Sequence, residues 1–161
     1  MAAPRLPNPG TVILLCGLPA SGKTTLARVL ERERPALVLS EDVWVARMFP
    51  PEAAYGDDID DIRERINVVH WDIAVRVAKL GVDVVLDWGV WARSERDDYR
   101  ARAAALGIPI ELRYLEAPRD ELLRRIATRN AALPPETFRI EDGQLDVWIA
   151  VFEPPTPDEL A

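Results

Sequence analysis

Residues 17–24 read Gly-Leu-Pro-Ala-Ser-Gly-Lys-Thr, a combination of residue types that can bind a triphosphate. In the pattern G-x-x-x-x-G-K-[ST], glycines let the backbone turn so that its N–H groups surround phosphate oxygens. The ammonium of Lys23 would reach the β- and γ-phosphates, and the hydroxyl of Thr24 would ligate Mg²⁺. The alternative is a plain glycine-rich turn beside a surface lysine. We expect a site for ATP and Mg²⁺ formed by Gly17, Leu18, Pro19, Ala20, Ser21, Gly22, Lys23, Thr24 and Thr25.

Two aspartates follow predicted strands and provide the next candidates for chemistry. Asp42 comes just after the apolar run 36–40, where a carboxylate can accept the proton of an acceptor hydroxyl as a general base. The alternative is that Asp42 caps a helix that begins at Val43. Asp87 ends the apolar run 82–87 and is expected to hold Mg²⁺ or its water, or else to be a simple polar residue at a strand end. The two aspartates could also exchange these roles.

Two pairs of arginines are candidates for binding anionic groups. Arg93 and Arg96 lie just past the third predicted strand and suit an anionic or hydroxyl-rich acceptor, unless they only balance the acidic residues beside them. Arg125 and Arg129 are four residues apart, hence on one helix face. They could stabilise the charge on a moving phosphoryl group, or they could belong to a solvated face.

The pattern of apolar residues predicts an α/β fold with a parallel sheet covered on both faces. Predicted strands cover residues 11–16, 36–40, 82–87 and 110–115, with a weaker fifth at 138–140. Predicted helices cover residues 22–34, 43–49, 59–80, 94–106, 118–130 and 144–152. Ser94 is expected to cap its helix. We predict a single domain over residues 1–161, with a loose tail at 1–10 and a Pro-rich tail at 153–161.

The long predicted helix 59–80 carries one apolar stripe that should face the sheet. The stripe consists of Ile59, Ile62, Ile66, Val69, Ile73, Val77 and Leu80. His70 and Trp71 lie beside it and are interpreted as packing residues. Three further indoles flank the two aspartates and either belong to the core or line an acceptor pocket, namely Trp44, Trp88 and Trp91.

Composition disfavours several classes of partner. The chain has 27 acidic and 20 basic residues, and its net charge of -7 opposes binding to nucleic acid or to an anionic membrane. Cys16 is the single cysteine, so no internal disulfide is expected. The apolar run 12–15 is too short for a signal or a membrane span. We therefore expect a soluble, cytoplasmic protein.

Several segments together resemble a known family of small bacterial ATP-binding kinases. The segments are Gly17 to Thr24, Ser40-Glu41-Asp42, Val85-Leu86-Asp87-Trp88-Gly89, 93–96, 122–130 and Phe152-Glu153-Pro154-Pro155. Over residues 11–157 the chain is similar to AAA_33-type proteins, relatives of polynucleotide kinase, zeta toxin and chloramphenicol phosphotransferase. The resemblance implies a P-loop NTPase three-layer sandwich with strand order 2-3-1-4. It also implies that Asp42 is the base, that Asp87 is the acidic position after the third strand, and that Arg125 and Arg129 belong to a mobile lid.

One position departs from the polynucleotide kinases in this group. They have an arginine three residues after the base, where this chain has Val45, and the nearest arginine is Arg47. This difference favours a small-molecule kinase that phosphorylates a hydroxyl. The alternatives are an ATP hydrolase or nucleotide switch, and a polynucleotide or RNA end kinase.

Overall fold

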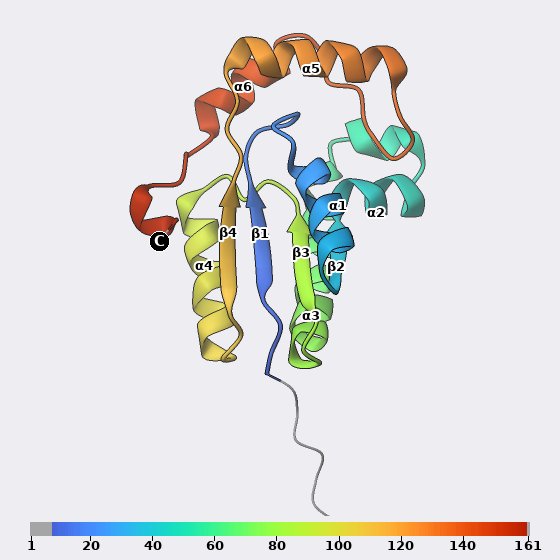
Figure 1. Cartoon of the computed structure of the whole chain (residues 1–161). Coiled ribbons are helices and arrows are strands. Elements are labelled where there is room, and N and C mark those ends of the chain that lie inside the picture. The colour runs from blue at the N-terminus through green and yellow to red at the C-terminus, as the bar shows by residue number, and fades with distance from the viewer. Residues whose placement is uncertain (1–7, 161) are drawn as a thin grey trace, which may run out of the picture.

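The computed structural model describes residues 8–160, and a sheet of four parallel strands lies at its centre (Figure 1). The strands are β1 Val12–Cys16, β2 Ala36–Ser40, β3 Asp83–Asp87 and β4 Ile110–Tyr114. Their order is β2-β3-β1-β4, so the predicted α/β fold and strand order are confirmed. All residues of β1 are buried, because helices cover both faces of this central strand.

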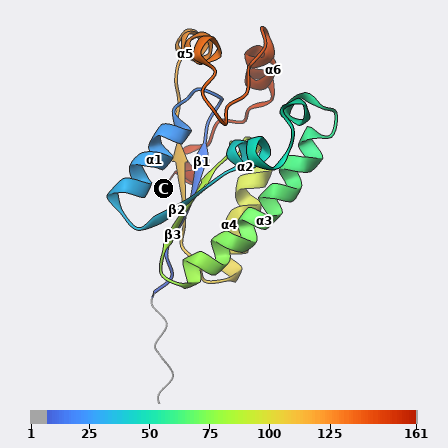
Figure 2. The ribbon, with the colours of Figure 1, turned by 90° about the vertical axis from the view of Figure 1, so that its right-hand side faces the viewer.

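The helices lie on both faces of the sheet and across its carboxyl edge. Among residues 8–160 they are α1 Lys23–Glu33, α2 Glu41–Met48, α3 Ile59–Lys79, α4 Arg93–Ala105, α5 Arg119–Ala132 and α6 Gln144–Val151, with 3₁₀ turns at Pro51–Tyr55 and Pro157–Glu159. Figure 2 shows α1 on one face of the sheet and α3 with α4 on the other. Right-handed crossovers between parallel strands produce this division. Helices α5 and α6 lie beyond the carboxyl ends of the strands (Figures 1 and 2).

Alternate residues of the strands supply two separate cores. Leu14 and Leu86 face α3 and α4, where they pack with Trp71 and Tyr99. On the other face of the sheet, Ala27 of α1 packs with Ile13, Leu15 and Val85 of the strands. This two-sided burial fixes the strands, and therefore fixes the edge from which the candidate site residues extend.

The buried face of α3 differs from the predicted stripe. Val69 and Leu80 are exposed, whereas the buried residues are Ile66, His70, Trp71, Ala74 and Ala78. The two alanines have small side chains that let the helix backbone approach the sheet, so the centre of the contact lies there. Larger residues of the predicted stripe lie at its margins. His70 and Trp71 do pack in the interior, as predicted.

Three further expectations are revised. Residues 138–140 form no strand, and Ile140 packs instead against α5 and α6. The side-chain amide of Asn130 donates to the backbone carbonyl of Ile140 and accepts from the backbone N–H of Ile140. Helix α4 begins one residue earlier than expected, so Ser94 lies inside it. Residues 1–7 of the expected N-terminal tail lie outside the described residues, and Gly10 is buried with its N–H bonded to the carbonyl of Ala78.

The segment after α6 is held against α4 by a buried ion pair. Arg96 is fully buried, and its guanidinium donates to Glu159 at 2.7 and 3.1 Å. The same guanidinium donates to the carbonyls of Val90 and Trp91, so its polar hydrogens have partners on three sides. Since Glu159 is only 7% exposed, both charges depend on each other for compensation.

We expect Glu159→Gln to lower the free energy of unfolding at pH 7 by about 3 kcal/mol, because Arg96 is left without an anionic partner. The hydrogen bond from Arg96 lowers the pKa of Glu159 from 4.5 to about 2. Its stabilisation is therefore complete above pH 4.5 and is lost as the pH falls toward 2. Urea denaturation at pH 7, 4.5 and 3 should show this acid dependence in the wild type and a weaker one in the variant.

Asp158→Asn is the matched control, because Asp158 is an exposed carboxylate in the same segment. An exposed pair of this kind contributes little to stability, because solvent screens its charges. Equal losses of stability in the two variants would show that the Arg96–Glu159 pair does not hold the segment.

Candidate active site

The loop between β1 and α1 adopts a tight turn that requires glycine. Gly17 has φ 149° and Gly22 has φ 109°, values that favour glycine. A Cβ atom at Gly17 would lie 2.5 Å from the carbonyl oxygen of Leu115 and 2.7 Å from the hydroxyl of Ser21. Ala20 also has a positive φ of 65°, a strained conformation that occurs often at ligand-binding sites.

Lys23 extends back over this loop from the first turn of α1. Its Nζ donates to the carbonyls of Gly17 at 2.8 Å and Leu18 at 2.9 Å. Burial lowers the pKa of Lys23, and the charges of Asp87 and Asp42 oppose this effect. The ammonium is thus held inside the loop, close to both predicted acidic residues.

Thr24 and Asp87 are in direct contact. The Thr24 hydroxyl donates to Oδ2 of Asp87 at 2.9 Å. Burial raises the pKa of Asp87, while the Thr24 hydrogen bond and the charge of Lys23 lower it. The hydroxyl and carboxylate that the sequence assigned to Mg²⁺ therefore lie together at the carboxyl edge of the sheet.

Asp42 lies in the first turn of α2 and does not cap it. The helix begins at Glu41, with Ser40 before it, and no side chain caps its N-terminus. The capping alternative for Asp42 is therefore not supported. Its Oδ1 accepts an ion pair from Arg63 of α3 at 2.9 Å, and the side chain keeps 54% of its surface exposed.

The charges around Asp42 come from all parts of the predicted site. Removal from bulk water and then the negative charge of Asp87 raise the pKa of Asp42, and solvent at its exposed side screens part of this effect. The positive charges of Lys23 and Arg129 act in the opposite direction. A base candidate, a phosphate-binding lysine and a lid arginine thus share one electrostatic environment.

Sequence reasoning missed the residues that orient α2. Glu41 is buried and accepts hydrogen bonds from Arg63 and, at 2.8 Å, from Nδ2 of Asn67. Because Arg63 also pairs with Asp42, one α3 guanidinium fixes both carboxylates at the start of α2. The spacing of Arg63 and Asn67, four residues apart on the long helix, was the available signal.

The α5 arginines lie against the phosphate-binding loop. Arg125 donates to the carbonyl of Ala20 at 3.1 Å. Burial lowers the pKa of Arg129, the charge of Asp42 opposes this, and Nε of Arg129 is buried without a hydrogen-bond partner. Arg124 and Arg125 both pair with Glu121, but in the described part of the chain the side chain of Arg124 forms no hydrogen bond to the loop.

Arg93 and Arg96 have structural partners instead of a place in an acceptor site. Arg93 donates to Thr156 at 2.9 Å and to Asp158 at 2.7 Å, and Arg96 is buried with Glu159. The expected acceptor-binding role is therefore replaced by one in holding the segment after α6. Their partners lie about 60 residues away, so local sequence could not reveal them.

The loop residues fit a nucleotide phosphate. The hydroxyl of Ser21 is buried without a partner inside the turn, and Nε of Arg129 is also buried without a partner. Phosphate oxygens can accept from both. Within residues 8–160 no group of three or more acidic, imidazole or thiol side chains forms an all-protein metal site. Mg²⁺ commonly binds to one or two protein oxygens together with substrate phosphates, which Thr24 and Asp87 suit.

The tryptophans divide between the core and the loop. Trp88 is buried, and its ring stacks on His70 at 5.4 Å, with Trp44 at the edge of the imidazole. Burial lowers the pKa of His70 to about 4, so it is neutral at pH 7. Trp91 instead donates to the carbonyl of Gly17 at 3.3 Å and supports the phosphate-binding loop.

The strand order and the loop after β1 define a P-loop nucleotide-binding domain with a kinase-like fold. Residues 12–155 match the model of the AAA_33 family, described as an AAA domain. The chain belongs to this family.

Two further comparisons agree with this assignment. The chain is 27% identical over 124 residues to UPF0200 protein M164_1169 from Saccharolobus islandicus, covering 73% of this chain and 64% of that protein. Among solved structures, APE1195 is 26% identical with a TM-score of 0.65, over 97% of this chain and 86% of that one. A gluconokinase from Sinorhizobium meliloti 1021 shares the fold at 19% identity and a TM-score of 0.62, over 94% and 79% of the two chains.

From residue 8 to residue 160, no helix combines the length and apolar character needed to cross a membrane.

Lys23→Ala should weaken ATP binding about 10- to 100-fold, because hydrogen bonds to a charged partner contribute about 1.5–3 kcal/mol. The melting temperature should change little, since Lys23 lies outside both hydrophobic cores. Lys79→Ala, at the exposed end of α3, is the matched control. Calorimetric titration with Mg-ATP measures the difference, and equal affinities in the two variants would contradict the assignment of the loop.

Proposed function

We propose that this protein transfers the γ-phosphoryl group of ATP to a hydroxyl of a small-molecule acceptor. The observation that carries the proposal is the different environment of the two carboxylates beside Lys23. Asp87 is buried and bonded by Thr24, as suits a residue that holds Mg²⁺. Asp42 is half exposed and outside the Thr24 contact, as suits a group that must meet an acceptor.

The chain's own residues account for each part of such a transfer. Asp42 accepts the proton of the acceptor hydroxyl while the oxygen of that hydroxyl forms a bond to the γ-phosphorus. The bond from this phosphorus to the β–γ bridging oxygen breaks, and ADP leaves with the electron pair. Lys23 turns from the loop carbonyls to the phosphates, and Arg125 and Arg129 face the charge on the transferred group. Mg²⁺, held by Thr24 and Asp87, would neutralise charge on the β- and γ-phosphates.

Two observations favour a small acceptor over a nucleic-acid end. Val45 is buried at the position where polynucleotide kinases have an arginine, and Arg47 pairs with Glu136. Neither residue offers a free guanidinium to an acceptor phosphate. The net charge of -7 agrees with this inference.

A hydrolase or nucleotide switch is less well supported. A hydrolase would be favoured if Asp42 served only as a helix cap, but α2 begins before Asp42 and has no side-chain cap. We also infer that the protein acts in the cytoplasm, where ATP is available and where the buried thiol of Cys16 stays reduced.

Asp42→Asn should leave ATP affinity and melting temperature near the wild-type values and lower phosphoryl transfer about 100- to 10,000-fold. The raised pKa of Asp42 also predicts a direction with pH: transfer by the wild type should fall on acidification at a higher pH than an ordinary aspartate would cause. Rates of transfer and of acceptor-free hydrolysis against pH measure both effects.

Asp72→Asn, on an exposed position of α3, provides the control for this substitution. If transfer by Asp42→Asn stays within a few-fold of the control, Asp42 is not the base, and Asp87 would take that role.

Arg129→Ala should lower kcat about 10- to 1,000-fold with a smaller effect on ATP affinity, because the guanidinium meets charge that develops during transfer. Arg124→Ala should leave both values unchanged, since within residues 8–160 the Arg124 side chain forms hydrogen bonds only with Glu121 of its own helix. Steady-state kinetics with varied ATP separates kcat from KM. Wild-type kinetics in Arg129→Ala would show that Arg129 has no role in transfer.

A further inference from the structure

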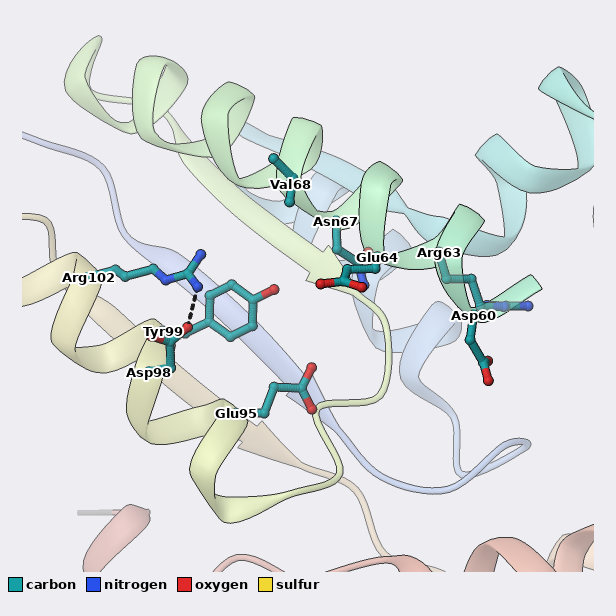
Figure 3. Close-up of a pocket in the computed structure, with 9 residues that line it drawn as sticks. All are labelled: Asp60, Arg63, Glu64, Asn67, Val68, Glu95, Asp98, Tyr99 and Arg102. Atoms are coloured by element: carbon teal, nitrogen blue, oxygen red, sulfur yellow. Dashed lines mark ion pairs between the residues drawn. The ribbon is translucent and has the colours of Figure 1, made fainter. Parts of the chain in front are cut away.

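A pocket of about 350 Å³ opens between α3 and α4, beside the base candidate (Figure 3). Its lining residues are Asp60, Arg63, Glu64, Asn67, Val68, Glu95, Asp98, Tyr99 and Arg102. One of them, Arg63, also pairs with Asp42, so the wall of the pocket is in contact with the proposed base.

The pocket has more negative charge than its own cations compensate. The guanidinium of Arg63 points away from Glu95 and Tyr99 and pairs with Glu41 and Asp42 outside the pocket (Figure 3). Arg102 is paired with Asp98 at 2.6 Å. Three lining carboxylates therefore have no ion-pair partner within residues 8–160, namely Asp60, Glu64 and Glu95.

Glu95 is the least exposed of these three carboxylates. It is partly buried and accepts a hydrogen bond at 3.1 Å from the backbone N–H of Trp91. Burial raises the pKa of Glu95, and backbone N–H groups at Trp91 and Ala92 oppose the shift. A bound cation would stabilise the ionised carboxylate in this place.

Unpartnered polar groups give independent evidence for a ligand. The hydroxyl of Tyr99, a residue only 7% exposed, points into the pocket, and its own hydrogen has no acceptor in the described part of the chain (Figure 3). The indole N–H of Trp88 lies toward this hydroxyl oxygen, and the hydrogen bond that it donates lowers the pKa of Tyr99, against the larger effect of burial that raises it. Oδ1 of Asn67 is buried without a partner. Such groups cost stability unless a ligand supplies their partners.

We propose that the pocket between α3 and α4 binds the phosphoryl acceptor through an ammonium group, so that the acceptor is a hydroxylated amine. The inference rests on the proposed kinase function and names the substrate class of that site. Glu64 and Glu95 face the ammonium, while Tyr99 and Asn67 bind hydroxyl groups of the same molecule. A carboxylate or phosphate on the acceptor would meet like charges in this pocket.

Direct binding tests the charge of the acceptor without requiring turnover. The probes are glucosamine and neamine, each compared with its fully N-acetylated form, which keeps the ring hydroxyls and lacks the positive charge. In calorimetric titrations at low salt, each amine should bind at least about 10-fold more tightly than its acetylated form. The difference should shrink as salt is added, because ions screen a partly exposed charge pair.

Single substitutions assign this binding to the pocket. Glu64→Gln and Glu95→Gln should each weaken amine binding about 3- to 5-fold, the range for a partly exposed charge pair. Glu31→Gln on α1, on the opposite face of the sheet, should leave it unchanged. Tyr99→Phe removes a hydroxyl that points into the pocket, so it should weaken amine binding. A residue that only packs would leave binding unchanged.

Amines that bind no more tightly than their acetylated forms would overturn the proposal, as would wild-type amine binding in both glutamine variants. A kinase assay with the same probes, glucose and gluconate separates this inference from the proposed function. ATP-dependent phosphorylation of glucose or gluconate alone would refute the cationic acceptor and leave the kinase standing. Tight amine binding without transfer to any probe would support the pocket and count against the kinase.

Discussion

The parallel pairing of β3 with both β1 and β2 is the constraint on which the whole site depends. Leu14 pairs with Leu86, so the loop after β1 and the end of β3 reach the same edge of the sheet. Ser40 pairs with Asp87, so the start of α2 arrives there as well. Three segments that are far apart in sequence thereby place a lysine and two aspartates within one electrostatic environment. The cores on both faces of the sheet hold this register.

Arginine has an unusual share of the structural work in this chain. Because a guanidinium carries five donors in a rigid plane, it can satisfy several acceptors at once. Arg63 joins two carboxylates of α2, and Arg96 joins Glu159 to two backbone carbonyls. These two residues fix the surroundings of the site from α3 and α4. Arg129 is different, because its Nε remains available beside the loop.

The sequence predicted those features that local chemistry determines. Apolar runs located the four strands, and the spacing of glycines with Lys23 located the loop, since only glycine tolerates the backbone of such a turn. The prediction misplaced the buried face of α3, because the apolar stripe was traced through large side chains and left out Ala74 and Ala78. These two small residues are buried and let the helix approach the sheet closely. Arg93 and Arg96 were misassigned for a different reason: their partners are distant in sequence and become neighbours only through the fold.

The contact of Trp91 with the loop has a consequence for how the protein responds to light. Its indole N–H donates to the carbonyl of Gly17, the same oxygen that accepts from Lys23. When Lys23 turns toward phosphate, that oxygen keeps only the indole donor, and the electrostatic field at the ring changes with the departing ammonium. The emission of an indole depends on this field. Two hydrogen bonds through the shared Gly17 oxygen separate the indole from the lysine, so the emission of Trp91, one of five tryptophans, should report on phosphate in the loop.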